Sequence, residues 1–95
     1  MKIPVQKLSG RDLDWAVGQV AGIDPQSNPS SQWTVAGPII HRFGVSLRPF
    51  MRGWDASIIK DGRKYHAHGD TALHAAMRAL VAAHLGGEID IPEDR

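Results

Sequence analysis

Three of the five histidines fall within the ten residues from Tyr65 to His74, in the stretch YHAHGDTALH. His66 and His68 are separated by one residue, and alternate side chains of a β-strand point to the same face. Two imidazoles on one face suit either acid–base chemistry or metal binding. His74 follows Gly69 on an expected helix, on the side that faces solvent, so its position separates it from the strand pair.

A predicted β-hairpin supplies the neighbours of this pair. Asp61-Gly62 is typical of a type I′ turn, and it stands between residues 54–60 and 63–68, which read as strands. A two-residue turn fixes which side chains lie opposite each other. On one face these are Ser57 with His66 and Asp55 with His68, and on the core face they are Ile58 with Tyr65 and Ala56 with Ala67, with Trp54 beyond.

The face with Asp55, Ser57, His66 and His68 has the residue types of two kinds of site. Zinc accepts imidazole and carboxylate ligands. Asp55 is the one oxygen ligand near this pair and the chain has no cysteine, so we expect no metal ligands. A hydroxyl, an imidazole and a carboxylate are also the minimum for nucleophilic catalysis. No nucleophile elbow or oxyanion-hole glycine run accompanies Ser57, so we expect no catalytic residues and no cofactor.

The charge is uneven along the chain. The net charge is +1, which argues against a dedicated nucleic-acid binder. Residues 41–68 carry six Lys and Arg against two Asp, a net +4, whereas residues 88–95 carry four acidic residues against one Arg, a net −3. The basic middle either attracts an anion such as a phosphate or forms a solvated sheet face.

Aromatic and cationic residues together form the predicted ligand-binding set. Trp15 points away from the apolar stripe of its helix, so either the loop 24–36 with Trp33 covers it or it meets a ligand. Aromatic rings stack on a flat ligand, and Arg presents a planar donor fork to phosphate. We expect Arg42 and Arg48 to converge on one sheet edge. The predicted ligand-binding residues are Trp15, Trp33, His41, Arg42, Arg48, Trp54, Tyr65, His66 and His68.

The elements around these residues predict one compact α+β domain over residues 1–95, a small antiparallel sheet with two helices packed against it. The strands are expected at 2–8, 45–50, 54–60, 63–68 and 88–92, and the helices at 10–21 and 71–85. Ser9 with Asp12 approximates a capping box, Gly22 ends the first helix, and Asp70 or Thr71 caps the second. The second helix carries an apolar stripe of Leu73, Ala76, Met77, Leu80, Val81 and His84, with His74 and Arg78 pointing away. On that stripe His84 is expected to be a hydrogen-bonded core residue.

The chain resembles a known family in several segments. LSGRDLDWAVGQVAG, GPII (37–40), Trp54 and GDTALHAAMRALVAAHLGGEIDIP are similar to the NinX-like family of small temperate-bacteriophage proteins. The chain departs from the family at Gly18, where alanine is usual, and its middle is shorter. The resemblance implies a phage origin and a small α+β fold, and it implies no particular activity.

Three classes of function remain open. The first is a non-enzymatic accessory protein that sequesters a host-derived anionic ligand, such as a nucleotide-type immune signal, as a counter-defence sponge. The second is a protein–protein adaptor or inhibitor of a host protein, and the third is a small phosphodiesterase-like hydrolase using His66 and His68. The first is favoured, because the chain has anion-binding and aromatic residues without a convincing catalytic set. The expected location is the cytoplasm of the infected bacterial host, with no membrane contact, and a pocket shared between subunits of a homo-oligomer would suit so small a domain.

Overall fold

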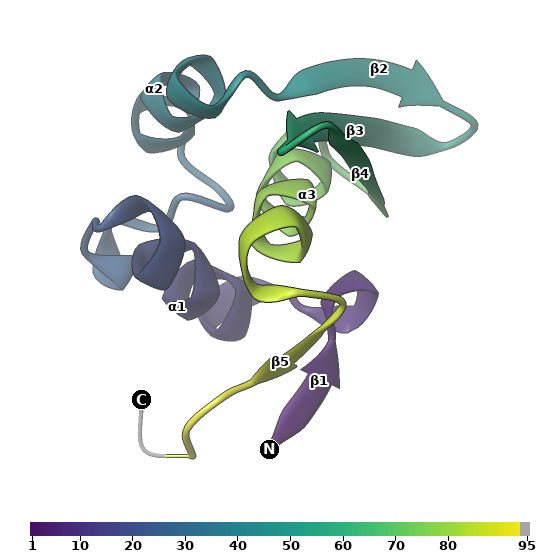
Figure 1. Cartoon of the computed structure of the whole chain (residues 1–95). Helices are drawn as coiled ribbons and strands as arrows, with labels where there is room; N and C mark the ends of the chain where they lie inside the picture. The colour runs from purple at the N-terminus through teal and green to yellow at the C-terminus, as the bar shows by residue number, and fades with distance from the viewer. Residues whose placement is uncertain (94–95) are drawn as a thin grey trace.

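The computed structural model describes residues 1–93, which form an α+β fold (Figure 1). In this part of the chain, three α-helices accompany two antiparallel sheets. The elements are β1 (Lys2–Pro4), α1 (Gly10–Ala21), α2 (Trp33–Phe43), β2 (Ser46–Phe50), β3 (Gly53–Lys60), β4 (Arg63–Gly69), α3 (Ala72–Leu85) and β5 (Glu88–Asp90), with 3-10 turns η1 (Val5–Lys7) and η2 (Pro25–Ser27).

The α+β class is confirmed, but two details of the prediction are wrong. The predicted pair of helices omits α2, which begins at Trp33 inside the expected loop 24–36. The predicted single sheet is two sheets, because β1 pairs only with β5 and β2, β3 and β4 form a separate sheet. The first strand also stops at Pro4, and η1 follows it.

The predicted register of the central hairpin is confirmed. Asp61 and Gly62 form the turn with positive φ angles of 54° and 77°, as a type I′ turn requires. Ser57 lies opposite His66 and Asp55 opposite His68, and β2 extends both rows. The hairpin turn therefore determines which polar side chains share a face.

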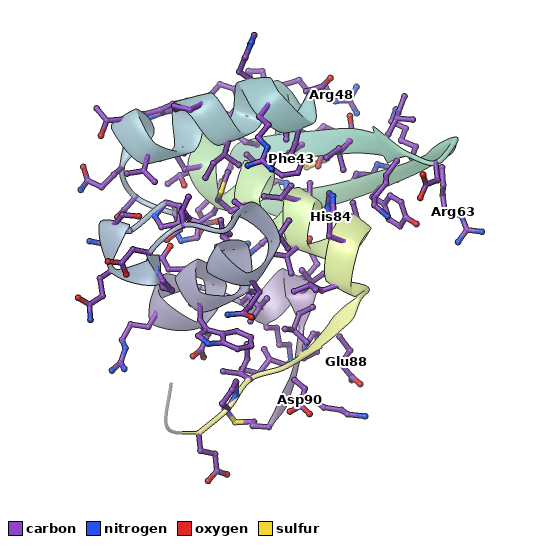
Figure 2. The ribbon with its side chains drawn as sticks, turned by 60° about the vertical axis from the view of Figure 1, so that its left-hand side comes forward. Phe43, Arg48, Arg63, His84, Glu88 and Asp90 are labelled. Atoms are coloured by element: carbon purple, nitrogen blue, oxygen red, sulfur yellow. The ribbon has the colours of Figure 1, made fainter. Side chains whose placement is uncertain are left out.

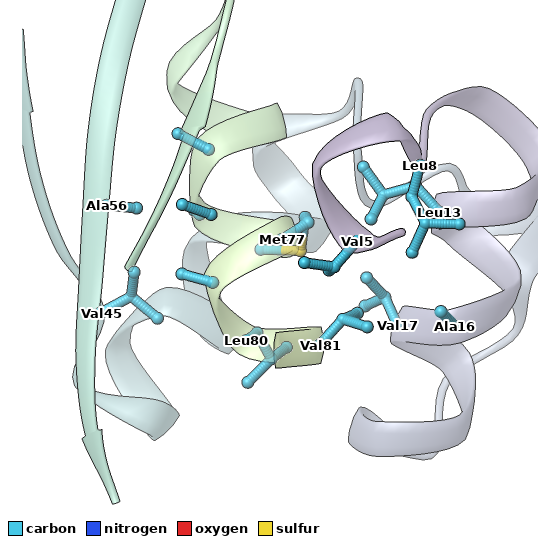
Figure 3. Close-up of a cluster of buried hydrophobic side chains, with 14 of the residues drawn as sticks. Val5, Leu8, Leu13, Ala16, Val17, Val45, Ala56, Met77, Leu80 and Val81 are labelled. Atoms are coloured by element: carbon cyan, nitrogen blue, oxygen red, sulfur yellow. The ribbon is translucent and has the colours of Figure 1, made fainter. Parts of the chain in front are cut away.

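The core is built around α3, which lies between the three-stranded sheet and α1 (Figure 1). The apolar residues of the predicted stripe are buried, from Leu73 to Val81. Ala75, Ala79 and Ala83 are buried as well, because the helix has neighbours on two sides. Figure 3 shows the two halves of this core: Val5, Leu8, Leu13, Ala16 and Val17 on one side of α3, and Val45 and Ala56 on the other.

The helix ends follow the expected chemistry in two of three cases. Gly22 ends α1 in the left-handed conformation with φ of 71°. The Thr71 side chain accepts a hydrogen bond from the His74 backbone N–H at 3.1 Å, so Thr71 rather than Asp70 caps α3. The expected capping box at α1 does not form, because the Ser9 side chain makes no capping bond.

Candidate functional site

The outer face of the three-stranded sheet carries the polar side chains that the hairpin brings together. The buried residues Ala56, Ile58 and Ala67 occupy the opposite face, toward α3. Side chains alternate along each strand, so the register sets two polar rows on the outer face. The rows are Ser46, Ser57 and His66, and Arg48, Asp55 and His68.

Asp55 lies between Arg48 and His68 in its row and contacts both of them. One carboxylate oxygen lies 3.5 Å from Arg48 Nη2, and the other lies 3.6 Å from His68 Nδ1. The Arg48 side chain is 72% exposed, and ion pairs this open contribute little to stability, about 0–1 kcal/mol each. The arrangement therefore orients the guanidinium and the imidazole more than it stabilises the fold.

A small hollow of about 120 Å³ lies on this face and is lined by Ser46, Arg48, Asp55, Ser57, Lys64 and His66, together with Leu47 and Ala56. We call Arg48, Lys64, His66 and His68, with Asp55 between them, the outer basic face. Arg48 and Lys64 against Asp55 give it a net +1, which rises if the two histidines are protonated. Glu88 and Asp90 lie at the far end of the molecule from Arg48 (Figure 2), so the acidic strand β5 does not neutralise this face. Asp94 and Arg95 of the predicted acidic tail lie outside the described residues.

Lys64 was not among the predicted binding residues. Its position two residues before His66 on β4 places it on the same face, and this spacing was the available signal.

The hydroxyl and imidazole of the central row are not joined. Ser57 and His66 are partners across the ladder, but within residues 1–93 no hydrogen bond links their side chains. In the same part of the chain, no three His, Cys, Asp or Glu side chains gather closely enough to hold a metal ion. Arg48 and Lys64 give this face N–H donors and positive charge, which suit binding an anion.

The predicted grouping of aromatic and cationic residues is divided by the sheet. Trp54 and Tyr65 lie on the α3 face, partly buried against the core, whereas Arg48, His66 and His68 lie on the outer face. A ligand on the outer basic face therefore cannot stack on Trp54 or Tyr65.

Arg42 is also directed elsewhere. It extends from α2, donates to the Ala21 carbonyl at the end of α1 over 3.4 Å, and lies 4.8 Å above the Phe43 ring. The hollow of the outer basic face is lined by Arg48 and not by Arg42, so the expected convergence of the two arginines is not observed. His41, the neighbour of Arg42, is exposed on α2.

The remaining tryptophans line separate hollows. Trp15 is half-buried against the core and lines a hollow with Pro25 and Asn28, from the segment that follows α1. Trp33 is 58% exposed and lines a different hollow of about 260 Å³, next to the start of α3. The segment after α1, rather than Trp33, is therefore the neighbour of Trp15.

Two histidines of α3 make local hydrogen bonds. His74 Nδ1 lies 2.8 Å from Thr71 Oγ1, and burial followed by the charge of Arg78 lowers the pKa of His74 below its ordinary value. His74 is thus half-buried and neutral near pH 7, where the sequence predicted a solvent-facing residue. His84 Nδ1 lies 3.1 Å from the Leu80 carbonyl and its ring contacts Phe43 edge-on (Figure 2), which confirms the predicted hydrogen bond, although the side chain is only partly buried and does not belong to the core.

These features define a small α+β domain with a polar, basic sheet face. Residues 14–84 match the family described as Bacteriophage P22, NinX, and the chain belongs to this family. None of the curated proteins compared with the chain matches it. Within residues 1–93, no helix has the length and apolar character needed to span a membrane.

Proposed function

We propose that this phage protein is a non-enzymatic accessory protein whose outer basic face binds a small phosphate-bearing ligand. The observation that carries the proposal is the position of Arg48, Lys64, His66 and His68 on one face of the sheet, where Arg48 and His68 also contact the Asp55 carboxylate. Within the described residues, the buried side of this sheet faces α3 and its outer side remains open (Figure 1).

Chemistry favours a phosphate over other anions at this face. Arg48 presents a planar donor fork, and its high exposure leaves N–H groups available beside the Asp55 contact. Lys64 and the two histidines add hydrogen-bond donors on the neighbouring strand. Several phosphate oxygens could therefore accept hydrogen bonds at the same time. A nucleotide with more than one phosphate could accept hydrogen bonds from more of these donors than a ligand with a single carboxylate could.

In the cytoplasm of an infected host, such binding would sequester a nucleotide-type immune signal. The protein would act by stoichiometric capture, so its effect would depend on its abundance and affinity.

Calorimetric titration with a panel of mono-, di- and cyclic nucleotides tests the proposal. Arg48→Ala and Lys64→Ala should each weaken binding roughly ten- to hundredfold, the usual effect of losing a charge-assisted hydrogen bond. Arg42→Ala is the matched control, because Arg42 is engaged with the Ala21 carbonyl and should leave affinity unchanged. Removal of residues 93–95 should leave affinity unchanged or slightly higher. If no nucleotide binds, the sequestration proposal fails.

A protein partner is the second candidate, favoured by apolar side chains beside the same face. Phe50 and Ile59 are 44% and 72% exposed on the outer side of the sheet, and Met51 in the adjoining turn is 88% exposed. Exposed apolar groups of this kind occur at protein interfaces. Ile59→Ser should leave nucleotide affinity unchanged if a nucleotide is the ligand, and should weaken capture of a host protein if the adaptor function is correct.

The hydrolase alternative has a separate test. Cyclic dinucleotides incubated with the protein should be recovered intact if the protein only binds them. Hydrolysis that is lost in His66→Ala and His68→Ala would instead establish catalysis by this pair.

A further inference from the structure

Asp14 on α1 is a buried acidic residue without a salt bridge to any described residue. Asp14 is 5% exposed, and one carboxylate oxygen accepts a hydrogen bond from the Ser30 backbone N–H at 2.8 Å. Among the described residues, no Lys, Arg or His forms an ion pair with Asp14. Buried carboxylates are normally paired or fully hydrogen-bonded, since an uncompensated buried charge is costly.

The imidazole that interacts electrostatically with Asp14 does not supply the missing charge. His74 is that group, and burial and the nearby Arg78 lower its pKa. His74 is therefore neutral near pH 7. The Arg78 guanidinium is directed to the carbonyls of Leu8 and His68, at 2.8 and 2.9 Å.

Asp14 lines the hollow of about 460 Å³ that also exposes Trp15. The rest of its lining comes from Arg11, Asp24, Pro25, Gln26 and Asn28. The wall opposite α1 is η2, which packs closely because Gly18 has no side chain: a Cβ there would lie 2.9 Å from Pro25 Cγ. Asp14 and Asp24 against Arg11 give the lining a net −1, opposite in sign to the outer basic face.

We propose that this hollow, the Trp15 hollow, binds an organic cation of the guanidinium type, with Asp14 as the hydrogen-bond acceptor and Trp15 as the aromatic surface. A guanidinium is flat and weakly hydrated, and it both forks onto a carboxylate and stacks on an indole. It would offer the Asp14 carboxylate further N–H donors and a positive charge, beside the Ser30 N–H that it already accepts from. The site is independent of the outer basic face, because it differs in place, charge and ligand.

Chemical-shift mapping by NMR tests the site with three probes. Agmatine presents the guanidinium as a free small cation, N-acetyl-arginine amide presents it as a protein segment would, and N-acetyl-citrulline amide is the neutral control of the same shape. Both guanidinium probes should shift the Trp15 indole and the Asp14 and Ser30 amides. The citrulline probe should bind at least roughly tenfold more weakly, because it lacks the charge. Tighter binding of the arginine amide than of agmatine would identify a protein segment as the natural source.

Three variants locate the binding. Trp15→Leu should weaken binding roughly tenfold, whereas Trp33→Leu, which alters an exposed tryptophan in another hollow, should not. Asp14→Asn also alters the hydrogen bond with Ser30. Its effect on binding is therefore compared only if its amide spectrum is that of a folded protein. Absence of shifts with both guanidinium probes, equal binding of the citrulline probe, or no effect of Trp15→Leu would overturn the proposal.

Discussion

Truncation of Leu80 tests the architecture on which both sites depend. Leu80 is fully buried in α3, which packs against the sheet and against α1 (Figure 3). Leu80→Ala removes most of the side chain and leaves a cavity, which costs about 2–5 kcal/mol. A domain of this size has a total stability of about 5–15 kcal/mol, so the loss is a large fraction of it. The thermal midpoint should fall by roughly 10–30 °C.

Thermal unfolding followed by circular dichroism measures this effect, with Leu85→Ala as the control on the same helix. Leu85 is 43% exposed, so its truncation should shift the midpoint by only a few degrees, about 4 °C or less. Leu80→Asp should prevent folding, because it buries an unpaired charge. Equal shifts for the two alanine variants, or a near-native midpoint for Leu80→Asp, would refute the placement of α3 at the centre of the core.

The remaining predictions concern backbone contacts, protonation and metal content. Gly53→Ala should destabilise the sheet, because its Cβ would lie 2.5 Å from the Gly69 carbonyl oxygen, whereas Gly37→Ala in α2 meets no atom within 4 Å and should stabilise by about 0.5–1 kcal/mol in denaturant titrations. The lowered pKa of His74 means that the unfolded chain binds its proton more readily, so the stability from neutral His74 is complete above about pH 6.5 and is lost as the pH falls. Urea midpoints between about pH 7.5 and about pH 5 should therefore change less in His74→Gln than in the natural chain. Elemental analysis of protein purified without an affinity tag should find no stoichiometric transition metal. A stoichiometric metal that disappears in the His66→Ala, His68→Ala double variant would contradict the anion-binding assignment of that pair.

The parts of the fold that sequence predicted well are those with strong local signals. The Asp61-Gly62 turn determined the hairpin register, and with it the pairing of Ser57 with His66 and Asp55 with His68. The periodicity from Leu73 to Val81 identified the central helix. Each of these signals depends on backbone geometry within a short stretch, so no long-range information was needed.

The missed helix shows where local signals mislead. α2 contains Gly37-Pro38, which favours a turn, and a proline inside a helix costs about 3 kcal/mol. Burial of Ala36 and Ile39 against the rest of the chain offsets this cost, and that burial is visible only in three dimensions.

The candidate site was predicted in part for the same reason. Alternation along the hairpin placed His66 and His68 beside Asp55, but the addition of Arg48 depends on how β2 pairs with β3. The separation of Arg42 from Arg48 depends on α2 and on the Ala21 carbonyl, which lies 21 residues away along the chain. No pattern in the sequence indicated that the Asp14 carboxylate is buried, because its burial follows from the fold of the segment that ends at Ser30.

The assignment of phosphate binding to the outer basic face is tested most directly by amide proton–nitrogen NMR spectra recorded during titration with inorganic pyrophosphate. Pyrophosphate carries the proposed ligand chemistry without a base, so its contacts report the anion site alone. The largest shift changes should fall on Arg48, Lys64, His66 and His68, and they should be lost in Arg48→Ala but kept in Arg42→Ala. Shift changes confined to Arg42 and its neighbours on α2, or no saturable change at any residue, would contradict the assignment.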